Sequence, residues 1–146
     1  MVAAIYGPQK TTVDSKGRMN FPAKFREKLG ESFVITVNMN NVNHLKVYSE
    51  EDFEALALKM QAMGKTEAEA ANILRFLQVN SQDAKPDKQG RIVLSAELRK
   101  HAGIEAEAIV LGAGKGAEIW NRANLDKATS TEVKESYADV TKDLNI

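Results

Sequence analysis

Residues 14–30 of the chain read DSKGRMNFPAKFREKLG, and residues 87–103 read DKQGRIVLSAELRKHAG, an equivalent stretch 73 positions later. Both contain an aspartate, a glycine and two arginines at the same places, and both end on glycine. Such self-similarity indicates an internal duplication. A copy of about 45 residues is too small to bury a stable core alone, so we expect the two copies to fold as one pseudo-symmetric unit.

Each copy predicts the same order of elements: a strand, a tight turn, a second strand, a short helix and a β-hairpin. The turn glycines, Gly17 and Gly90, can adopt positive φ without a steric penalty. Pro22 suits the start of the first short helix, and Ser95 is the expected cap of the second. Gly30 and Gly103 are expected to end these two helices. The expected strands are 11–14, 18–21, 33–37 and 45–48 in the first copy, and 91–94, 108–111 and 117–120 in the second.

Longer helices are predicted between the copies and at the C-terminus. Ser49 and Thr66 resemble caps of two successive helices. Apolar residues at helical spacing favour core packing over subunit contacts: Phe53, Leu56 and Met60 in the first of these helices, and Val133, Tyr137, Val140 and Leu144 near the C-terminus. The expected fold class is α+β. We divide it into halves at 8–55 and 82–126, a helical connector at 56–81 and a C-terminal helix at 127–146.

The charges are distributed unevenly along the chain. The 146 residues contain 20 Lys+Arg and 20 Asp+Glu, so the formal net charge is zero. Residues 1–30 hold six basic and two acidic residues, and residues 84–103 hold five basic and two acidic ones. These two segments carry +7, and the rest of the chain carries −7. If the pseudo-twofold brings the two segments together, they form a basic surface that attracts and orients a polyanion.

Several classes of protein are disfavoured. The chain has no cysteine, which removes disulfides, zinc fingers and cysteine nucleophiles. His44 and His101 belong to no metal-spaced or catalytic motif, and the glycine-rich run at 112–116 lacks the spacing of a phosphate-binding loop. That run is expected to be a hairpin turn. We expect no enzyme, metal or cofactor. No apolar run of about 18 residues and no signal-peptide pattern occurs, so we expect no membrane association and a cytoplasmic location.

At these residues the chain resembles the MraZ family of bacterial transcriptional regulators, which are built from two SpoVT/AbrB-type halves. The resemblance covers roughly residues 8–126 and rests on a repeated Asp-x-x-x-Arg motif, formed by Asp14 with Arg18 and by Asp87 with Arg91. It implies a pseudo-twofold double-split β-barrel of two AbrB-like halves with helices, assembled into a ring-shaped homo-oligomer. It also implies nucleoid-associated binding to double-stranded DNA, at repeated boxes in the promoter of its own cell-division and cell-wall gene cluster, as a repressor.

The resemblance assigns DNA contact to Arg18 and Arg91. Their chemistry agrees, because an arginine that follows a glycine turn offers a planar fork of donors to phosphate or guanine. Asp14 and Asp87 are interpreted as structural: each accepts backbone N–H groups within the turn and orients the nearby arginine. The remaining basic residues are interpreted either as phosphate contacts or as helix-surface charges: Lys16, Lys88, Lys24, Arg26 and Arg99.

Two other functions stay open. One is a DNA-independent oligomeric interaction protein that uses the apolar helical stripes. The other is an AbrB-like global regulator or antitoxin. Chains of that kind usually carry one such motif and form the pair by dimerisation, whereas this chain carries two.

Overall fold

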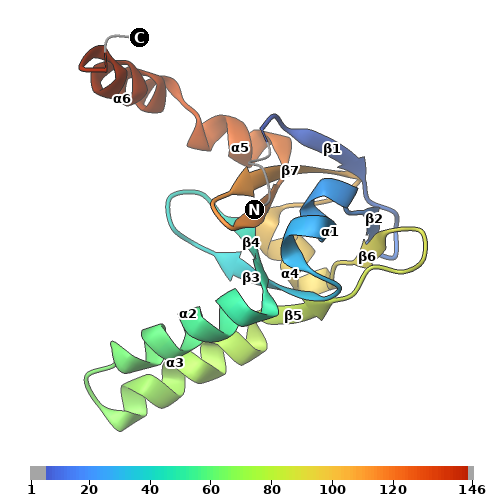
Figure 1. Cartoon of the computed structure of the whole chain (residues 1–146), viewed down its shortest axis with the longest axis vertical. Coiled ribbons are helices and arrows are strands. Elements are labelled where there is room, and N and C mark those ends of the chain that lie inside the picture. Colours follow the sequence, from blue (N-terminus) through green and yellow to red (C-terminus); the bar gives the residue numbers. More distant parts are fainter. Residues whose placement is uncertain (1–5, 145–146) are drawn as a thin grey trace.

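The computed structural model describes residues 6–144, and the order of elements repeats along the chain (Figure 1). Residues 1–5, and residues 145–146 of the expected C-terminal segment, lie outside the described part. The first half contains β1 (Gln9–Thr12), β2 (Arg18–Asn20), α1 (Ala23–Leu29), β3 (Phe33–Asn38), β4 (His44–Ser49), α2 (Glu50–Ala62) and α3 (Glu67–Val79). The second contains β5 (Ser81–Ala84), β6 (Arg91–Val93), α4 (Ala96–Ala102), β7 (Glu107–Ala113), β8 (Gly116–Trp120), α5 (Arg122–Ala128) and α6 (Thr131–Lys142). The chain is therefore an α+β protein with two similar halves, as its sequence predicts.

The two halves share one six-stranded antiparallel sheet in the order β1-β7-β8-β4-β3-β5. β1 pairs with β7 of the second half, and β5 pairs with β3 of the first half. The hairpins β3–β4 and β7–β8 meet at the centre of the sheet through β4 and β8. Within residues 6–144 the ladder stays open, with β1 and β5 as its edges. Because each edge strand belongs to the opposite half, neither half completes its part of the sheet alone, and the two copies form a single folding unit.

A second, two-stranded ladder is formed by β2 and β6, one strand from each half. Met19 faces Ile92 at its centre, and both side chains are almost completely buried. Successive side chains of a strand point to opposite faces. The residues on either side of Met19 and Ile92 are therefore directed outward, and Arg18 and Arg91 share this outer face.

The main core lies beneath the β2–β6 ladder and draws equally on both halves. Phe21 packs against Phe33 and Phe25, with ring centroids 4.8 Å and 5.8 Å apart. Their fully buried neighbours are Met19, Ile35, Leu45, Val47, Ile92, Leu94, Val110 and Ile119. Burial of each large apolar side chain contributes about 1.5–3 kcal/mol, so loss of either half removes support from the other.

The predicted helix ends and hairpin turn are confirmed. The Ser95 hydroxyl accepts a hydrogen bond from the Leu98 amide at 3.2 Å, and Gly103 ends α4 in the left-handed region. Ser49 caps α2 and Thr66 caps α3 through the same kind of bond. The glycine-rich run joins β7 to β8 as an antiparallel hairpin, in which Ala113 pairs with Gly116.

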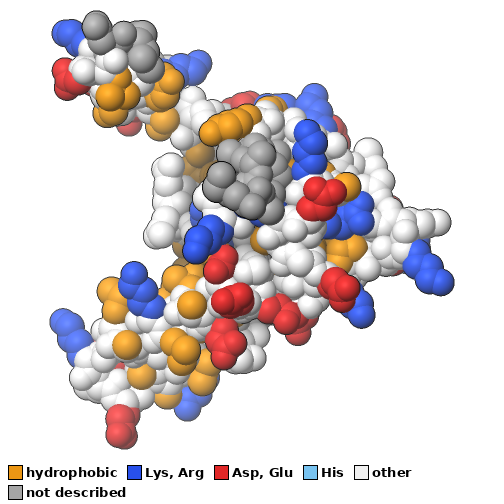
Figure 2. Space-filling view, viewed as in Figure 1, with side chains coloured by type: hydrophobic (Ala, Val, Ile, Leu, Met, Phe, Trp, Pro, Cys, Tyr) orange, Lys and Arg blue, Asp and Glu red, His pale blue; other side chains and the backbone are white. Residues whose placement is uncertain are grey.

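Two helical segments extend from the sheet. α2 and α3 pack against each other as an antiparallel arm, whereas α6 points away from the body beyond the short helix α5 (Figure 1). The prediction that the α6 stripe packs into a core is wrong, because Val133, Tyr137 and Val140 are 44%, 68% and 67% exposed. Within residues 6–144 no element covers this stripe, and α6 follows directly on the short helix α5, which has 7 residues. Hydrophobic side chains are visible on both the arm and α6 (Figure 2).

Candidate nucleic-acid interface

Both Asp-x-x-x-Arg segments fold into the same hydrogen-bonded turn. Oδ1 of Asp14 accepts the amides of Lys16 and Arg18, each at 2.9 Å. The Asp14 carbonyl accepts the Gly17 amide at 2.9 Å. The second turn repeats this pattern: Oδ1 of Asp87 accepts the amides of Gln89 and Arg91, again at 2.9 Å, and the Asp87 carbonyl accepts that of Gly90. Each aspartate therefore closes its own turn by accepting two backbone amides.

The second carboxylate oxygen of each aspartate holds the arginine of the motif. Nε of Arg18 donates to Oδ2 of Asp14 at 2.6 Å, and Nε of Arg91 donates to Oδ2 of Asp87 at 3.0 Å. The arginine side chains stay 42% and 38% exposed. Within residues 6–144 the Nη groups make no hydrogen bond, so each turn presents a fixed guanidinium with its outer donors available to a ligand.

The turn geometry also keeps both aspartates ionised. The Arg18 backbone N–H is the main cause that lowers the pKa of Asp14, followed by the Arg18 side chain. The Arg91 backbone N–H lowers the pKa of Asp87 in the same way. Each carboxylate therefore stays charged, and stays bonded to its arginine, at acidic pH values at which an ordinary aspartate begins to take up a proton.

The β2–β6 register places the two arginines near each other. Arg18 of β2 pairs with Val93 of β6, and Arg91 lies on β6 two residues before Val93. Two residues of a strand span about 7 Å along the ladder. The two guanidinium groups thus lie on one face, and Asp14 and Asp87 approach that face from opposite ends of the ladder.

The three lysines that the sequence analysis considered as phosphate contacts lie on the surface, in the two turns and on α1. Lys16 and Lys88 are exposed within the two turns, and Lys24 is exposed on α1. Within residues 6–144 none of the three forms an ion pair, so their charges add to the field of the two arginines.

Arg26 and Arg99 occupy different surroundings from the lysines. Both are partly buried, and each guanidinium donates through Nε to a carbonyl of its own half: Arg26 to Phe21 and Arg99 to Leu94, both at 3.1 Å. Each also packs over the turn glycine of the opposite half. The sequence interpretation did not include this contact between the halves. One sequence signal could have indicated a shared role: Arg26 and Arg99 each lie eight residues after the arginine of their own Asp-x-x-x-Arg motif.

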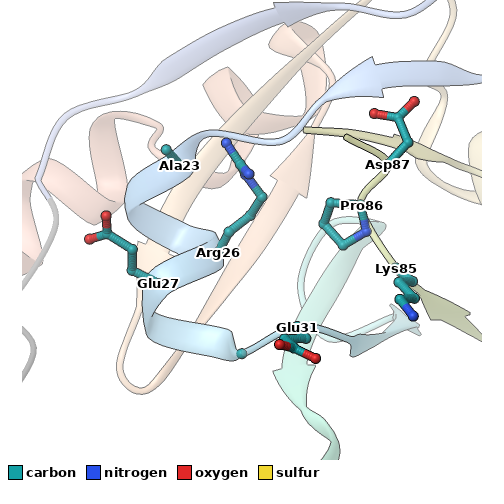
Figure 3. A pocket seen from close by; sticks show the side chains of 8 residues that line it. Ala23, Arg26, Glu27, Glu31, Lys85, Pro86 and Asp87 are labelled. Carbon is teal, nitrogen blue, oxygen red and sulfur yellow. The ribbon is translucent and has the colours of Figure 1, made fainter. Parts of the chain in front are cut away.

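A cavity of about 640 Å³ lies between α1 and the second turn (Figure 3). Arg26 and Glu27 line it from α1, and Lys85, Pro86 and Asp87 line it from the segment after β5. At the first turn Val13 extends the β1–β7 pairing through its N–H to Ala106. Pro86 occupies the equivalent place and has no N–H to donate, so the pairing of β5 stops earlier.

A separate charged cluster lies where β4 meets β8. Glu118 receives hydrogen bonds from Lys46 and from Trp120, and the His44 ring stacks on Trp120 with 4.0 Å between centroids. Nε2 of His44 lies 3.6 Å from Oε2 of Glu118, slightly beyond ordinary hydrogen-bond length but close enough for the polar ring nitrogen to stabilise the carboxylate. Burial alone would raise the pKa of Glu118, but His44, Lys46 and Trp120 outweigh it and lower that pKa from 4.5 to about 2. The sequence interpretation did not identify this cluster.

Within the described residues, no helix is long and apolar enough to cross a membrane, and no three His, Asp or Glu side chains are grouped to hold a metal ion. Together, the intertwined halves and the paired turns define a class of α+β proteins with an internal repeat, in which two aspartate-anchored arginines share one exposed ladder.

The chain belongs to the MraZ family. The family model described as "MraZ protein, putative antitoxin-like" matches residues 4–76 and 79–145, once for each half. A relative from Thermoanaerobacter sp. (strain X514) is 38% identical over 144 residues, covering 97% of this chain and 99% of the relative. One from Alkaliphilus oremlandii is 38% identical over 126 residues, covering 86% and 87%. One from Limosilactobacillus reuteri (strain DSM 20016) is 37% identical over 135 residues, covering 92% and 93%. All three are named "Transcriptional regulator MraZ", and the family is one of regulators, not of enzymes.

Proposed function

We propose that this protein is a DNA-binding transcriptional regulator that contacts double-stranded DNA through its two Asp-x-x-x-Arg turns. The observation that carries the proposal is that Arg18 and Arg91 share one exposed face, each held through Nε by an aspartate. The relatives named as transcriptional regulators support the same function. This is the function that the fold and the site support best.

The proposed contact uses the free edge of each guanidinium. With Nε held by the aspartate, the Nη groups can donate to two phosphate oxygens or to O6 and N7 of guanine. An arginine already fixed in one orientation loses little conformational entropy on binding. Asp14 and Asp87 act as positioning residues, because a carboxylate in direct contact with phosphate is repulsive.

The surrounding basic residues supply contacts that are independent of base sequence. Lys16, Lys24 and Lys88 are exposed without an ion-pair partner in the described part of the chain, so they can approach the DNA backbone. Arg26 and Arg99 are proposed to contribute charge to the same face while they brace the turns. Contacts of this kind release counterions from the DNA and make binding strongly salt-dependent.

We propose that the protein assembles into a ring-shaped homo-oligomer, in which α6 of one copy docks on the α2–α3 arm of the next. A largely hydrophobic groove of about 510 Å³ lies between the arm and the β3–β4 hairpin, and the arm lines it with residues that include Phe53, Leu56, Met60, Ile73 and Phe76. α6 offers an apolar stripe with helical spacing and lies at the other end of the molecule from the arm (Figure 1). An amphipathic helix in an apolar groove is a recurrent mode of association. Because the two surfaces differ, their contact is head-to-tail. Such a contact gives a closed ring when the rotation between successive copies adds up to a full turn.

Within this assembly we propose that the β2–β6 ladder covers the open sheet as one wall of a double-split barrel. A ring then presents the paired turns repeatedly to DNA boxes spaced near one helical turn, about 10 bp. Repeated presentation raises affinity through effective concentration without any new contact. The proposed sites are boxes in the promoter of the protein's own cell-division and cell-wall operon, where binding represses transcription. We place the protein in the cytoplasm, at the nucleoid.

The function is tested by fluorescence anisotropy of the full chain with a duplex from the region upstream of its own gene, at 50 and 200 mM salt. We expect binding tighter than to a random duplex, and a loss of more than about tenfold between the two salt concentrations. Footprinting of the same region should reveal repeated protected boxes. Equal binding to many unrelated promoters favours an AbrB-like global regulator. Absence of binding at 50 mM salt favours a DNA-independent interaction protein and refutes the proposal.

A further inference from the structure

Arg26 and Arg99 each contact the turn of the opposite half, so the two contacts are reciprocal. Arg26 belongs to the first half, but its guanidinium covers Gly90 in the second turn, where an added Cβ would lie 2.9 Å from Nη2. Arg99 belongs to the second half and covers Gly17 in the first turn, where an added Cβ would lie 2.9 Å from Nε. Each turn is therefore covered by an arginine from the opposite half, and the absence of a side chain on glycine makes this approach possible.

Main-chain hydrogen bonds reinforce each of these contacts. The Gly90 carbonyl accepts the Phe21 amide at 3.0 Å, and the Phe21 carbonyl accepts Nε of Arg26 at 3.1 Å. The Gly17 carbonyl accepts the Leu94 amide at 2.9 Å, and the Leu94 carbonyl accepts Nε of Arg99 at 3.1 Å. Phe21 and Leu94 are buried in the core. Each turn is thus connected, through one residue of the opposite half, to the rigid interior of the protein.

The chemistry of arginine suits this arrangement. Its planar guanidinium can lie flat against a peptide while Nε donates in the same plane, which the ammonium group of lysine cannot do. Within residues 6–144 neither Arg26 nor Arg99 forms an ion pair with a carboxylate, so no acidic partner neutralises them. Both arginines therefore brace a turn without a loss of positive charge at its base.

We propose that Arg26 and Arg99 are positioning residues that set the orientation of the DNA-contacting turn of the opposite half. Arg26 governs the turn that carries Arg91, and Arg99 governs the turn that carries Arg18. The two turns are consequently held in one fixed relative orientation and act as a single bipartite reader. This inference rests on the proposed DNA-binding function.

The first test measures the turns themselves in the free full-length protein. Hydrogen–deuterium exchange of Arg26→Ala should show faster exchange in residues 85–92, with residues 12–19 unchanged, and Arg99→Ala should show the reverse. Lys24→Ala, an exposed change on the same helix as Arg26, is the matched control and should alter neither segment. If each substitution loosens the turn of its own half, or both turns equally, the crossed assignment is refuted.

The second test is a set of double-mutant cycles on DNA affinity. Arg26→Ala should weaken binding by about 3- to 10-fold and lose most of this effect in an Arg91→Ala background, while adding fully to Arg18→Ala. Arg99→Ala should couple to Arg18→Ala and add to Arg91→Ala. Effects that add in all four combinations, or that couple within one half, overturn the proposal, because a general loss of stability has no crossed pattern.

A third comparison covers the case in which an alanine variant folds poorly. Arg26→Lys keeps the charge but loses the planar contact, so it should loosen residues 85–92 while unfolding near the wild-type midpoint. Unchanged exchange in this variant means that charge alone suffices and refutes the bracing role. If Arg18→Ala and Arg91→Ala both leave DNA affinity unchanged, the proposed function fails. The exchange experiment still decides between a crossed and an uncrossed brace in that event.

Discussion

Asp14 uses its two carboxylate oxygens for different purposes: Oδ1 accepts the backbone amide of Arg18 at 2.9 Å, and Oδ2 accepts Nε of the same arginine at 2.6 Å. One oxygen therefore closes the turn and the other orients the side chain. Asp87 and Arg91 repeat this division in the second half. The two roles can be separated by substitution, because asparagine retains one oxygen acceptor and replaces the other with a donor.

Asp14→Asn should preserve the turn and release the arginine. We expect a stability close to wild type and a smaller ratio of operator affinity to random-DNA affinity, because the guanidinium loses its fixed orientation while a negative charge is removed. Asp14→Ala loses both oxygens and should unfold at a lower urea concentration than Asp14→Asn. Urea unfolding and anisotropy titrations measure the two effects. Equal stabilities for the two variants would contradict the division of roles.

Arg18→Ala and Arg91→Ala should each weaken operator binding by about 1–3 kcal/mol, or roughly 5- to 150-fold. Both side chains are substantially exposed and lie outside the core, so the thermal midpoint and the assembly state should stay near wild type. Lys127→Ala, an exposed change on α5, serves as the control. Unfolding or dissociation of either arginine variant would assign that residue a structural role instead.

Gly17→Ala and Gly90→Ala should both destabilise the protein, and Gly17→Ala by more. The two glycines have φ of +85° and +80°, where an alanine costs about 1–2 kcal/mol. A Cβ at Gly17 also collides with the Leu94 carbonyl oxygen, a backbone atom, whereas the nearest atoms to a Cβ at Gly90 belong to the movable Arg26 side chain. Urea unfolding checks the ranking, with Ser15→Ala as a control in the same turn. The reverse ranking would show that the β2–β6 backbone adjusts more readily than the arginine.

Acid should remove the stability contributed by Glu118. The pKa of this group is lowered from 4.5 to about 2 in the folded protein, so its contribution is present above pH 4.5 and is lost as the pH falls toward 2. The shift corresponds to about 3 kcal/mol at neutral pH. We expect the stability difference between wild type and Glu118→Gln, measured by urea unfolding, to shrink steadily from pH 5 to pH 2. A difference that does not change with pH would show that the lowered pKa has no effect on folding.

Introduction of charge into the apolar stripe of α6 should dissociate the proposed oligomer. Tyr137 and Val140 are exposed, so Tyr137→Glu and Val140→Glu leave the core intact and should yield monomers in analytical ultracentrifugation. Met60→Glu in the groove of the arm should have the same effect. Lys134→Glu on the same helix is the control for added negative charge. Oligomers that persist in all three stripe and groove variants would exclude docking of α6 on the arm.

Local features of the fold were predictable from residue chemistry. The Asp14 and Asp87 turns, the Ser95 cap and the glycine stops each depend on residues within a few positions, and the structure contains all of them. The stripe of α6 was misassigned, because helical spacing alone does not reveal whether a partner surface exists in the same chain. Within residues 6–144 the stripe stays exposed, so such a surface does not cover it.

Residue spacing and chemistry were sufficient to predict two equivalent halves, an aspartate–arginine turn in each half, and a concentration of positive charge on these segments. Which residues of one half contact the other half became evident only from the folded chain. The exchange of β1 and β5 between the halves, and the antiparallel pairing of β2 with β6, place Arg26 over Gly90 and Arg99 over Gly17. A turn is fixed by hydrogen bonds between near neighbours in the chain, whereas a contact between halves depends on how distant strands share a buried core.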